Sequence, residues 1–106
     1  MDNNDHLNLL RVLEKKPNNN QRNLAEELGF SLGKINYCLN QLSKKGFIKI
    51  RNFKKNENKL AYKYLLTTKG VKKKTTLIIN FLNTKSKEYD ELQKELNKIK
   101  NKSQKE

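Results

Sequence analysis

Apolar residues at the start of the chain repeat with the period of a helix. Leu7, Leu10 and Leu13 recur every third position, which places them on one face of a helix over about residues 5–16. Pro17 follows and cannot continue a helix. The pattern therefore predicts a first amphipathic helix that ends before the proline.

Two further helices are indicated by their expected end residues. Asn20 and Ser31 are residue types that cap helix N-termini, and they precede the predicted helices at about residues 21–28 and 32–44. Gly29 lies between the helices and is suited to the left-handed conformation of a C-terminal cap. A short turn is therefore expected to connect the second helix to the third.

The hydrophobic period then changes to that of a β-hairpin. A strand is predicted to begin at Phe47, and a returning strand covers residues 60–66. Residues 54–59 are polar and form the expected basic tip. Tyr62 and Tyr64 are expected on alternate faces of the returning strand, one inward and one outward.

A last helix is predicted after Gly70, with apolar residues in alternating steps of four and three. This heptad seam spans about 28 residues, or about 42 Å, so its far end extends beyond so small a domain. Lys85 occupies a seam position and is expected to influence register, while parallel and antiparallel pairing both remain open. The predicted dimerisation residues are Val71, Ile78, Leu82, Tyr89, Leu92, Leu96 and Ile99.

Three helices followed by a hairpin is the element order of a winged helix-turn-helix. Ala25, Gly29 and Ile35 supply the small contact residue, the turn and the inward apolar residue that two steeply crossing helices require. We predict a mostly α-helical fold with a small β component. Residues 1–69 form the DNA-binding domain, and residues 70–106 form a C-terminal dimerisation helix in a coiled coil, its last residues disordered.

Positive charge is concentrated in one segment of the chain. The formal net charge is +13, and general lysine enrichment would distribute it along the whole length. Between Ser31 and Thr76 there are instead 13 Lys and Arg residues and one acid, Glu57, whereas the rest has 11 basic and 10 acidic residues. This localisation favours a polyanion, most simply nucleic acid.

The polar face of the third predicted helix supplies candidate base contacts. Asn can bond adenine, Lys can reach guanine, and glycine permits close approach to a groove. Lys34, Asn36, Tyr37 and Asn40 are the predicted base contacts. Gln21 and Arg22 begin the second helix, where free backbone N–H groups favour phosphate. The remaining predicted DNA-binding residues are Ser31, Gly33, Lys44, Arg51, Lys54, Lys55, Asn58 and Lys59, of which the last five lie on the wing.

Several segments resemble the exopolysaccharide-associated branch of the MarR family. They are residues 21–25 (QRNLA), 31–39 (SLGKINYCL), 45–50 (KGFIKI) and 58–62 (NKLAY). The resemblance implies a bacterial transcription regulator linked to exopolysaccharide or capsule genes. Thr68 departs from the proline common in that family, and Asn56-Glu57-Asn58 replaces the acid-to-arginine wing signature of larger MarR proteins.

Other functional classes find little support in the sequence. Cys38 is the sole cysteine and is expected to serve in packing, and His6 lacks partners at metal-ligand spacing and is expected to be solvated. No metal, cofactor or catalytic group is predicted, and the protein is not expected to be an enzyme. We expect a cytoplasmic homodimer that binds double-stranded DNA without a membrane partner; an effector is unassigned. The alternative is a winged module binding RNA or a protein.

Overall fold

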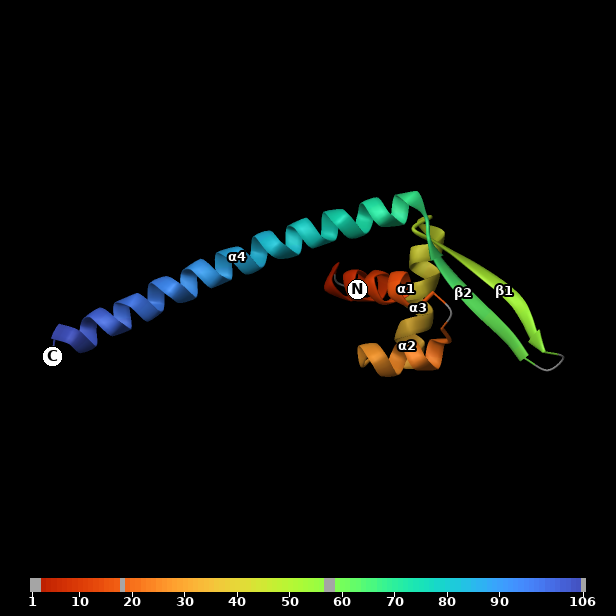
Figure 1. Cartoon of the computed structure of the whole chain (residues 1–106), viewed down its shortest axis with the longest axis horizontal. Coiled ribbons are helices and arrows are strands. Elements are labelled where there is room, and N and C mark those ends of the chain that lie inside the picture. The colour runs from red at the N-terminus through yellow and green to blue at the C-terminus, as the bar shows by residue number, and fades with distance from the viewer. Residues whose placement is uncertain (1–2, 18, 57–58, 106) are drawn as a thin grey trace.

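The chain folds into three short helices, a two-stranded hairpin and one long helix (Figure 1). The computed structural model describes residues 3–17, 19–56 and 59–105, with side chains except those of residues 53–61, 104 and 105. The predicted mostly helical winged-helix fold with a long C-terminal helix is confirmed. Its elements are α1 (Asn3–Lys15), α2 (Gln21–Leu28), α3 (Leu32–Lys44), β1 (Ile48–Asn56), β2 (Lys59–Leu66) and α4 (Thr68–Lys105).

The predicted capping residues fix the ends of α2 and α3. The side-chain oxygen of Asn20 accepts a hydrogen bond from the backbone N–H of Asn23 at 2.7 Å. Ser31 Oγ accepts one from the N–H of Lys34 at 3.1 Å. Gly29, with a φ of 70°, occupies the left-handed region that glycine tolerates. Capping chemistry therefore confirms the boundaries predicted for both helices.

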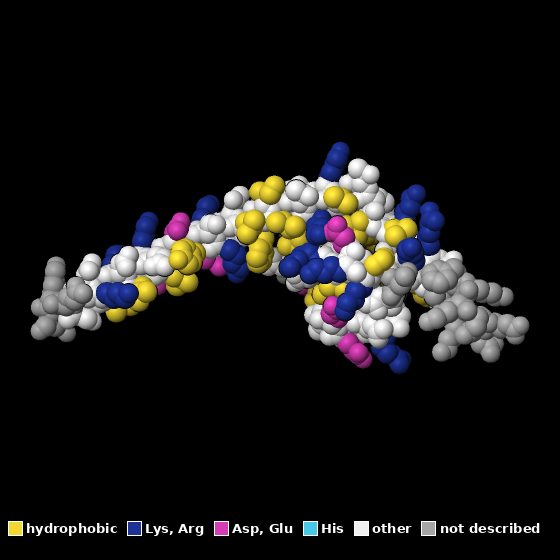
Figure 2. Space-filling model, in the orientation of Figure 1, with side chains coloured by type: hydrophobic (Ala, Val, Ile, Leu, Met, Phe, Trp, Pro, Cys, Tyr) yellow, Lys and Arg dark blue, Asp and Glu magenta, His cyan; other side chains and the backbone are white. Residues whose placement is uncertain are grey.

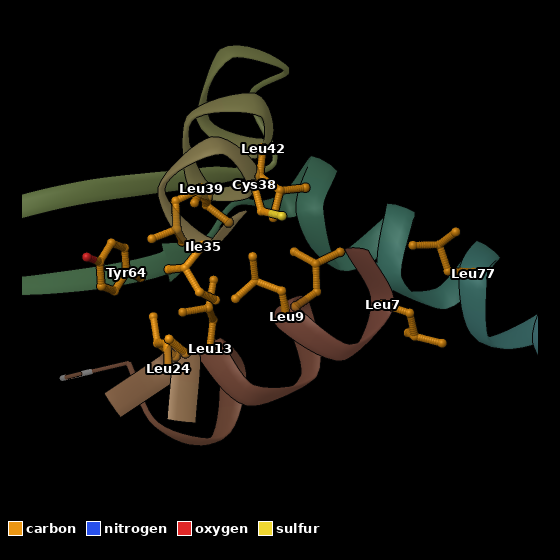
Figure 3. Packing of buried hydrophobic residues seen from close by; sticks show 13 residues of the cluster. Leu7, Leu9, Leu13, Leu24, Ile35, Cys38, Leu39, Leu42, Tyr64 and Leu77 are labelled. Atoms are coloured by element: carbon orange, nitrogen blue, oxygen red, sulfur yellow. The ribbon is translucent and has the colours of Figure 1, made fainter. Parts of the chain in front are cut away.

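The core lies where the inward faces of α1, α2 and α3 meet the hairpin and α4 (Figure 3). Ala25 and Ile35, which the helix-turn-helix pattern places at the crossing of α2 and α3, are both buried. The remaining buried apolar residues are Leu7, Leu9, Leu10, Leu13, Leu24, Cys38, Leu39, Leu42, Ile48, Tyr64 and Leu77. One continuous cluster thus holds every element of the winged domain.

Strands β1 and β2 pair antiparallel and are longer than the sequence pattern suggested. The tip was predicted at residues 54–59, which includes too many residues, because β1 continues to Asn56 and β2 begins at Lys59. The expected alternation of Tyr62 and Tyr64 was also wrong. Residues two apart share one face of a strand, and their rings stack with centroids 6.4 Å apart.

A tight joint connects the hairpin to α4. The Thr67 hydroxyl donates to the carbonyl of Gly46 at 2.6 Å and accepts from the N–H of Gly70 at 3.0 Å. A Cβ at position 70 would lie 1.9 Å from the carbonyl oxygen of Phe47, so only glycine fits there. This contact holds the first turn of α4 against the chain segment that begins the wing.

Only the beginning of α4 packs against the winged domain. Leu77 is buried against the core, and Lys74 forms an ion pair with Glu14 of α1. Farther along, the helix projects from the domain, giving a molecule 75 Å long and 26 Å wide (Figure 1). Apolar side chains recur along this projecting part (Figure 2). Within the described ranges, no helix combines the length and apolar character needed to cross a membrane.

Candidate nucleic-acid interface

Helix α3 separates a buried apolar face from an exposed polar face. Its inward residues include Ile35 and Leu39, which are fully covered. The predicted DNA-binding residues that lie exposed on α3, including its N-cap, are Ser31, Gly33, Asn36, Tyr37, Asn40 and Lys44. Because one helix face is fixed in the core, these outward side chains are presented by a rigid element.

Lys34 differs from the other predicted base contacts. Its ammonium nitrogen lies 3.0 Å from Asp5 Oδ2 and 4.1 Å from the centroid of the Phe30 ring. The side chain is therefore held by an ion pair with α1 and by a cation–π contact with the turn that precedes α3. A role in base reading would require Lys34 to leave both partners, so its position fits DNA contact less well than that of Asn36 or Asn40.

The start of α2 lies beside the exposed face of α3. Gln21 Nε2 donates a long hydrogen bond of 3.4 Å to Asn36 Oδ1. Burial raises the pKa of Tyr64, which lines the same hollow, whereas the neighbouring Gln21 amide opposes that rise. Arg22 is exposed at the same helix end. Of the two residues predicted to bind phosphate, Gln21 is thus the one held by a neighbouring side chain.

A hollow lies between the start of α2, helix α3 and the hairpin, and amide side chains line much of it. Asn20, Gln21 and Asn40 contribute from the helices, and Asn52 and Tyr62 contribute from the paired strands. Sequence reasoning missed the last two residues. Their signal was the strand alternation itself, because Asn52 pairs with Tyr62 across the hairpin and Ile50 pairs with Tyr64.

The wing residues are only partly described. Arg51 is exposed on β1. Lys54, Lys55 and Lys59 belong to the strands, but their side chains lie outside the described set, and Asn58 lies outside the described residues altogether. Their phosphate contacts therefore remain predictions based on residue type.

His6 is buried, which corrects the expectation that it is solvated. The side chain is 6% exposed, because α4 folds back over α1, and its Nε2 atom has no hydrogen-bond partner. Burial lowers the pKa of His6, with the positive charges of Lys45 and Lys73 adding to this effect. A hydrogen bond with Gln41 opposes the lowering, and Gln41 Nε2 itself donates to the Tyr37 hydroxyl at 2.8 Å.

Cys38 lies in the core, as the packing interpretation predicted. Burial raises the pKa of its thiol, with the nearby charge of Asp5 adding to the effect, so the unreactive protonated form is favoured. Among the described residues, no three His, Cys, Asp or Glu side chains are grouped so that they could hold a metal ion.

Comparisons with known proteins agree with this architecture. Residues 6–49 match the family described as winged helix-turn-helix DNA-binding. A comparison of the sequence with curated proteins found no significant match.

Solved structures of transcription regulators share the fold. The PcaV regulator of Streptomyces coelicolor, solved with its natural ligand, aligns over 74% of this chain and 55% of its own, with 18% identity and a TM-score of 0.65. FabT of Streptococcus pneumoniae, solved with DNA, aligns over 81% of this chain and 59% of its own, with 22% identity and a TM-score of 0.61.

A transcriptional regulator homologue from Pyrococcus horikoshii aligns over 76% of this chain and 79% of its own, with 11% identity and a TM-score of 0.61. The chain thus spans little more than half the length of PcaV and FabT. At these identities the likeness establishes the fold: a winged helix-turn-helix domain, similar to DNA-binding domains over residues 6–49, with a long helix appended to it.

Proposed function

We propose that this protein is a sequence-specific transcription regulator that binds double-stranded DNA. The observation that carries the proposal is the exposed face of α3, where Asn36, Tyr37 and Asn40 project from a helix whose opposite face is fixed in the core. An α-helix fits the major groove of B-DNA, and amides are suited to bond base edges there. The match of residues 6–49 to winged helix-turn-helix DNA-binding domains supports the same function.

The charge distribution supports a division of roles within the interface. The segment from Ser31 to Thr76 carries 13 basic residues and one acid. Contacts with phosphate contribute affinity without reading sequence, while contacts with base edges provide specificity. We assign phosphate contacts to Arg22, Lys44, Arg51 and the wing lysines, and base contacts to the amides and Tyr37 of α3.

We further propose that the protein acts as a homodimer through α4. In the projecting part of this helix, Leu82, Tyr89, Leu92 and Ile99 are each more than half exposed, and they recur at heptad spacing. A row of exposed large apolar residues at this spacing is typical of a coiled-coil seam. Symmetric pairing would place two winged domains on a pseudo-palindromic operator, with half-sites about 34 Å apart or a multiple of that distance.

The regulated genes are proposed from the resemblance alone. The sequence segments shared with the exopolysaccharide-associated branch of the MarR family favour operators near exopolysaccharide or capsule genes. No residue of the interface encodes that connection, because a fold and its reading residues do not specify what the neighbouring gene makes. Mapping the bound sites in the genome of the source organism tests this link separately from DNA binding.

The deciding experiment is selection from random duplex DNA, followed by sequencing and by affinity measurements at several salt concentrations. We expect one enriched motif with two-fold symmetry and an affinity that falls steeply as salt increases. A parallel measurement with single-stranded and duplex RNA tests the alternative of an RNA-binding module. Equal affinity for all duplex sequences, or tighter binding to RNA, would contradict the proposed function.

A further inference from the structure

Two side chains from different helices are joined at the edge of the candidate interface. Gln21, the first residue of α2, donates a hydrogen bond from Nε2 to Asn36 Oδ1 on α3. The bond measures 3.4 Å between heavy atoms. A single amide therefore connects the start of α2 to a residue of the exposed helix face.

The Gln21 end of this connection is fixed, since the Asn20 cap holds the first turn of α2. Gln21 lines the same hollow as Tyr64, whose side chain is 1% exposed and whose backbone N–H donates to the carbonyl of Pro17 at 3.0 Å. Figure 3 shows the Tyr64 ring beside the aliphatic cluster with the hydroxyl oxygen directed away from it. Asn36, by contrast, is exposed and takes its orientation from the bonds it makes.

The chemistry of the two amides determines which atoms remain for DNA. The Gln21 amide nitrogen can only donate, so it is matched by the acceptor oxygen of Asn36. With Oδ1 accepting from Gln21, Asn36 has its Nδ2 hydrogens left for a partner outside the protein.

We propose that Gln21 is a positioning residue that orients Asn36 to act as a hydrogen-bond donor toward DNA bases. The inference rests on the proposed function and makes it more specific. Asn36 then favours bases with acceptors in the major groove, such as the N7 and O6 of guanine or the O4 of thymine. The two-bond contact with adenine, which needs both Oδ1 and Nδ2 of Asn36, is disfavoured while Gln21 holds Oδ1.

The test compares base preferences after selection from random duplex DNA. Asn36→Ala first identifies the position in each half-site that Asn36 reads, as the position that loses its preference. Gln21→Glu then replaces a donor with a carboxylate that only accepts, so Asn36 must turn its Nδ2 toward position 21 and present Oδ1 to the DNA. At that position we expect the preference to shift by about fivefold toward the donors adenine N6 and cytosine N4.

A matched control isolates the orientation effect. Asn23→Glu adds the same charge to an exposed position of the same helical turn, and should weaken binding to all sequences without moving the preferred base. Thermal unfolding of each variant confirms that its domain is folded.

The possible results separate the two proposals. A wild-type protein that enriches no motif overturns the proposed function and this inference with it. A motif that Asn36→Ala leaves unchanged, or a base preference that is the same in wild type and Gln21→Glu, overturns the inference alone. A shifted preference with Gln21→Glu, absent from Asn23→Glu, supports it.

Discussion

Leucine residues recur at helical spacing both in the winged domain and in the projecting part of α4, but they are buried in the first region and exposed in the second. Leu9 and Leu10 of α1 are fully buried, whereas Leu92 and Leu96 of α4 are 63% and 45% exposed. Periodicity predicted an apolar face in both helices. It did not predict what covers that face, because covering depends on the other elements within reach. The winged domain completes its own core, and the projecting helix does not.

The difference in environment has a thermodynamic consequence. Burying a leucine or isoleucine side chain contributes about 1.5 to 3 kcal/mol relative to leaving it in water. In the winged domain this contribution is made within one chain and is independent of protein concentration. In α4 it is obtained only through a second molecule, so its size depends on concentration. Stability measured at two concentrations therefore separates the two regions.

The largest expected effect is the loss of a core leucine. Leu10→Ala removes a fully buried side chain and should reduce the free energy of unfolding by about 3 kcal/mol, within the range for such cavities. Denaturant unfolding at low micromolar concentration measures it. Leu96→Ala makes the same chemical change on α4 and should affect stability only at concentrations where the dimer forms. Equal destabilisation by both variants at all concentrations would contradict the contrast between the regions.

A charge in the α4 seam is expected to break the dimer while the winged domain remains folded. Leu92→Asp should raise the dissociation constant of the dimer at least about 100-fold, because pairing would bury two carboxylates. Sedimentation velocity shows the change as a shift from dimer to monomer. Asn97→Asp adds the same charge on the polar side of the helix and is the matched control. A wild-type protein that is monomeric at micromolar concentration would refute the dimer.

Within the winged domain, substitutions on α3 and α2 should affect DNA binding differently. Asn36→Ala is expected to cost about 1 to 2 kcal/mol at the preferred base and to relax selectivity at one position per half-site. Arg22→Ala should weaken binding to all sequences alike and reduce the slope of log affinity against log salt by about one per half-site. Fluorescence anisotropy with matched and mismatched duplexes measures both. Indistinguishable behaviour of the two variants would remove the division between base and phosphate contacts.

The smallest predicted effect is a dependence of stability on pH at the contact between α1 and α4. The pKa of His6 is lowered in the folded protein, mainly by burial, so protonation favours the unfolded state. Stability from this residue is complete above the ordinary histidine pKa of about 6.5 and decreases as pH falls below it. Chemical denaturation from pH 8 to pH 5 tests this, and His6→Gln should flatten the profile between pH 7 and pH 5.5.

Local chemistry made the helices predictable from the sequence. Asn20, Gly29 and Ser31 act through contacts within a few residues, and the structure places α2 and α3 at the predicted bounds. The polar face of α3 followed from the same periodicity. Each of these features depends on neighbours close in the sequence, which a single sequence displays directly.

Contacts between distant segments were not predictable in the same way. The burial of His6 depends on α4 returning over α1, and the bond between Gln21 and Asn36 joins α2 to α3. Lys34 meets Asp5 because the N-terminal helix lies beside α3. These interactions are set by how whole elements pack, which no local pattern of residue types encodes.

The tight joint at Gly70 gives the long helix a defined direction relative to the candidate nucleic-acid interface. In the proposed homodimer, the distance between the two reading surfaces therefore depends on where along α4 the copies meet. One heptad advances a helix by about 10 Å, at 1.5 Å per residue. Insertion or deletion of a heptad during evolution would change the separation of the operator half-sites while every base-reading residue stayed the same. Under the proposed function, operator spacing and operator sequence would thus be able to diverge independently.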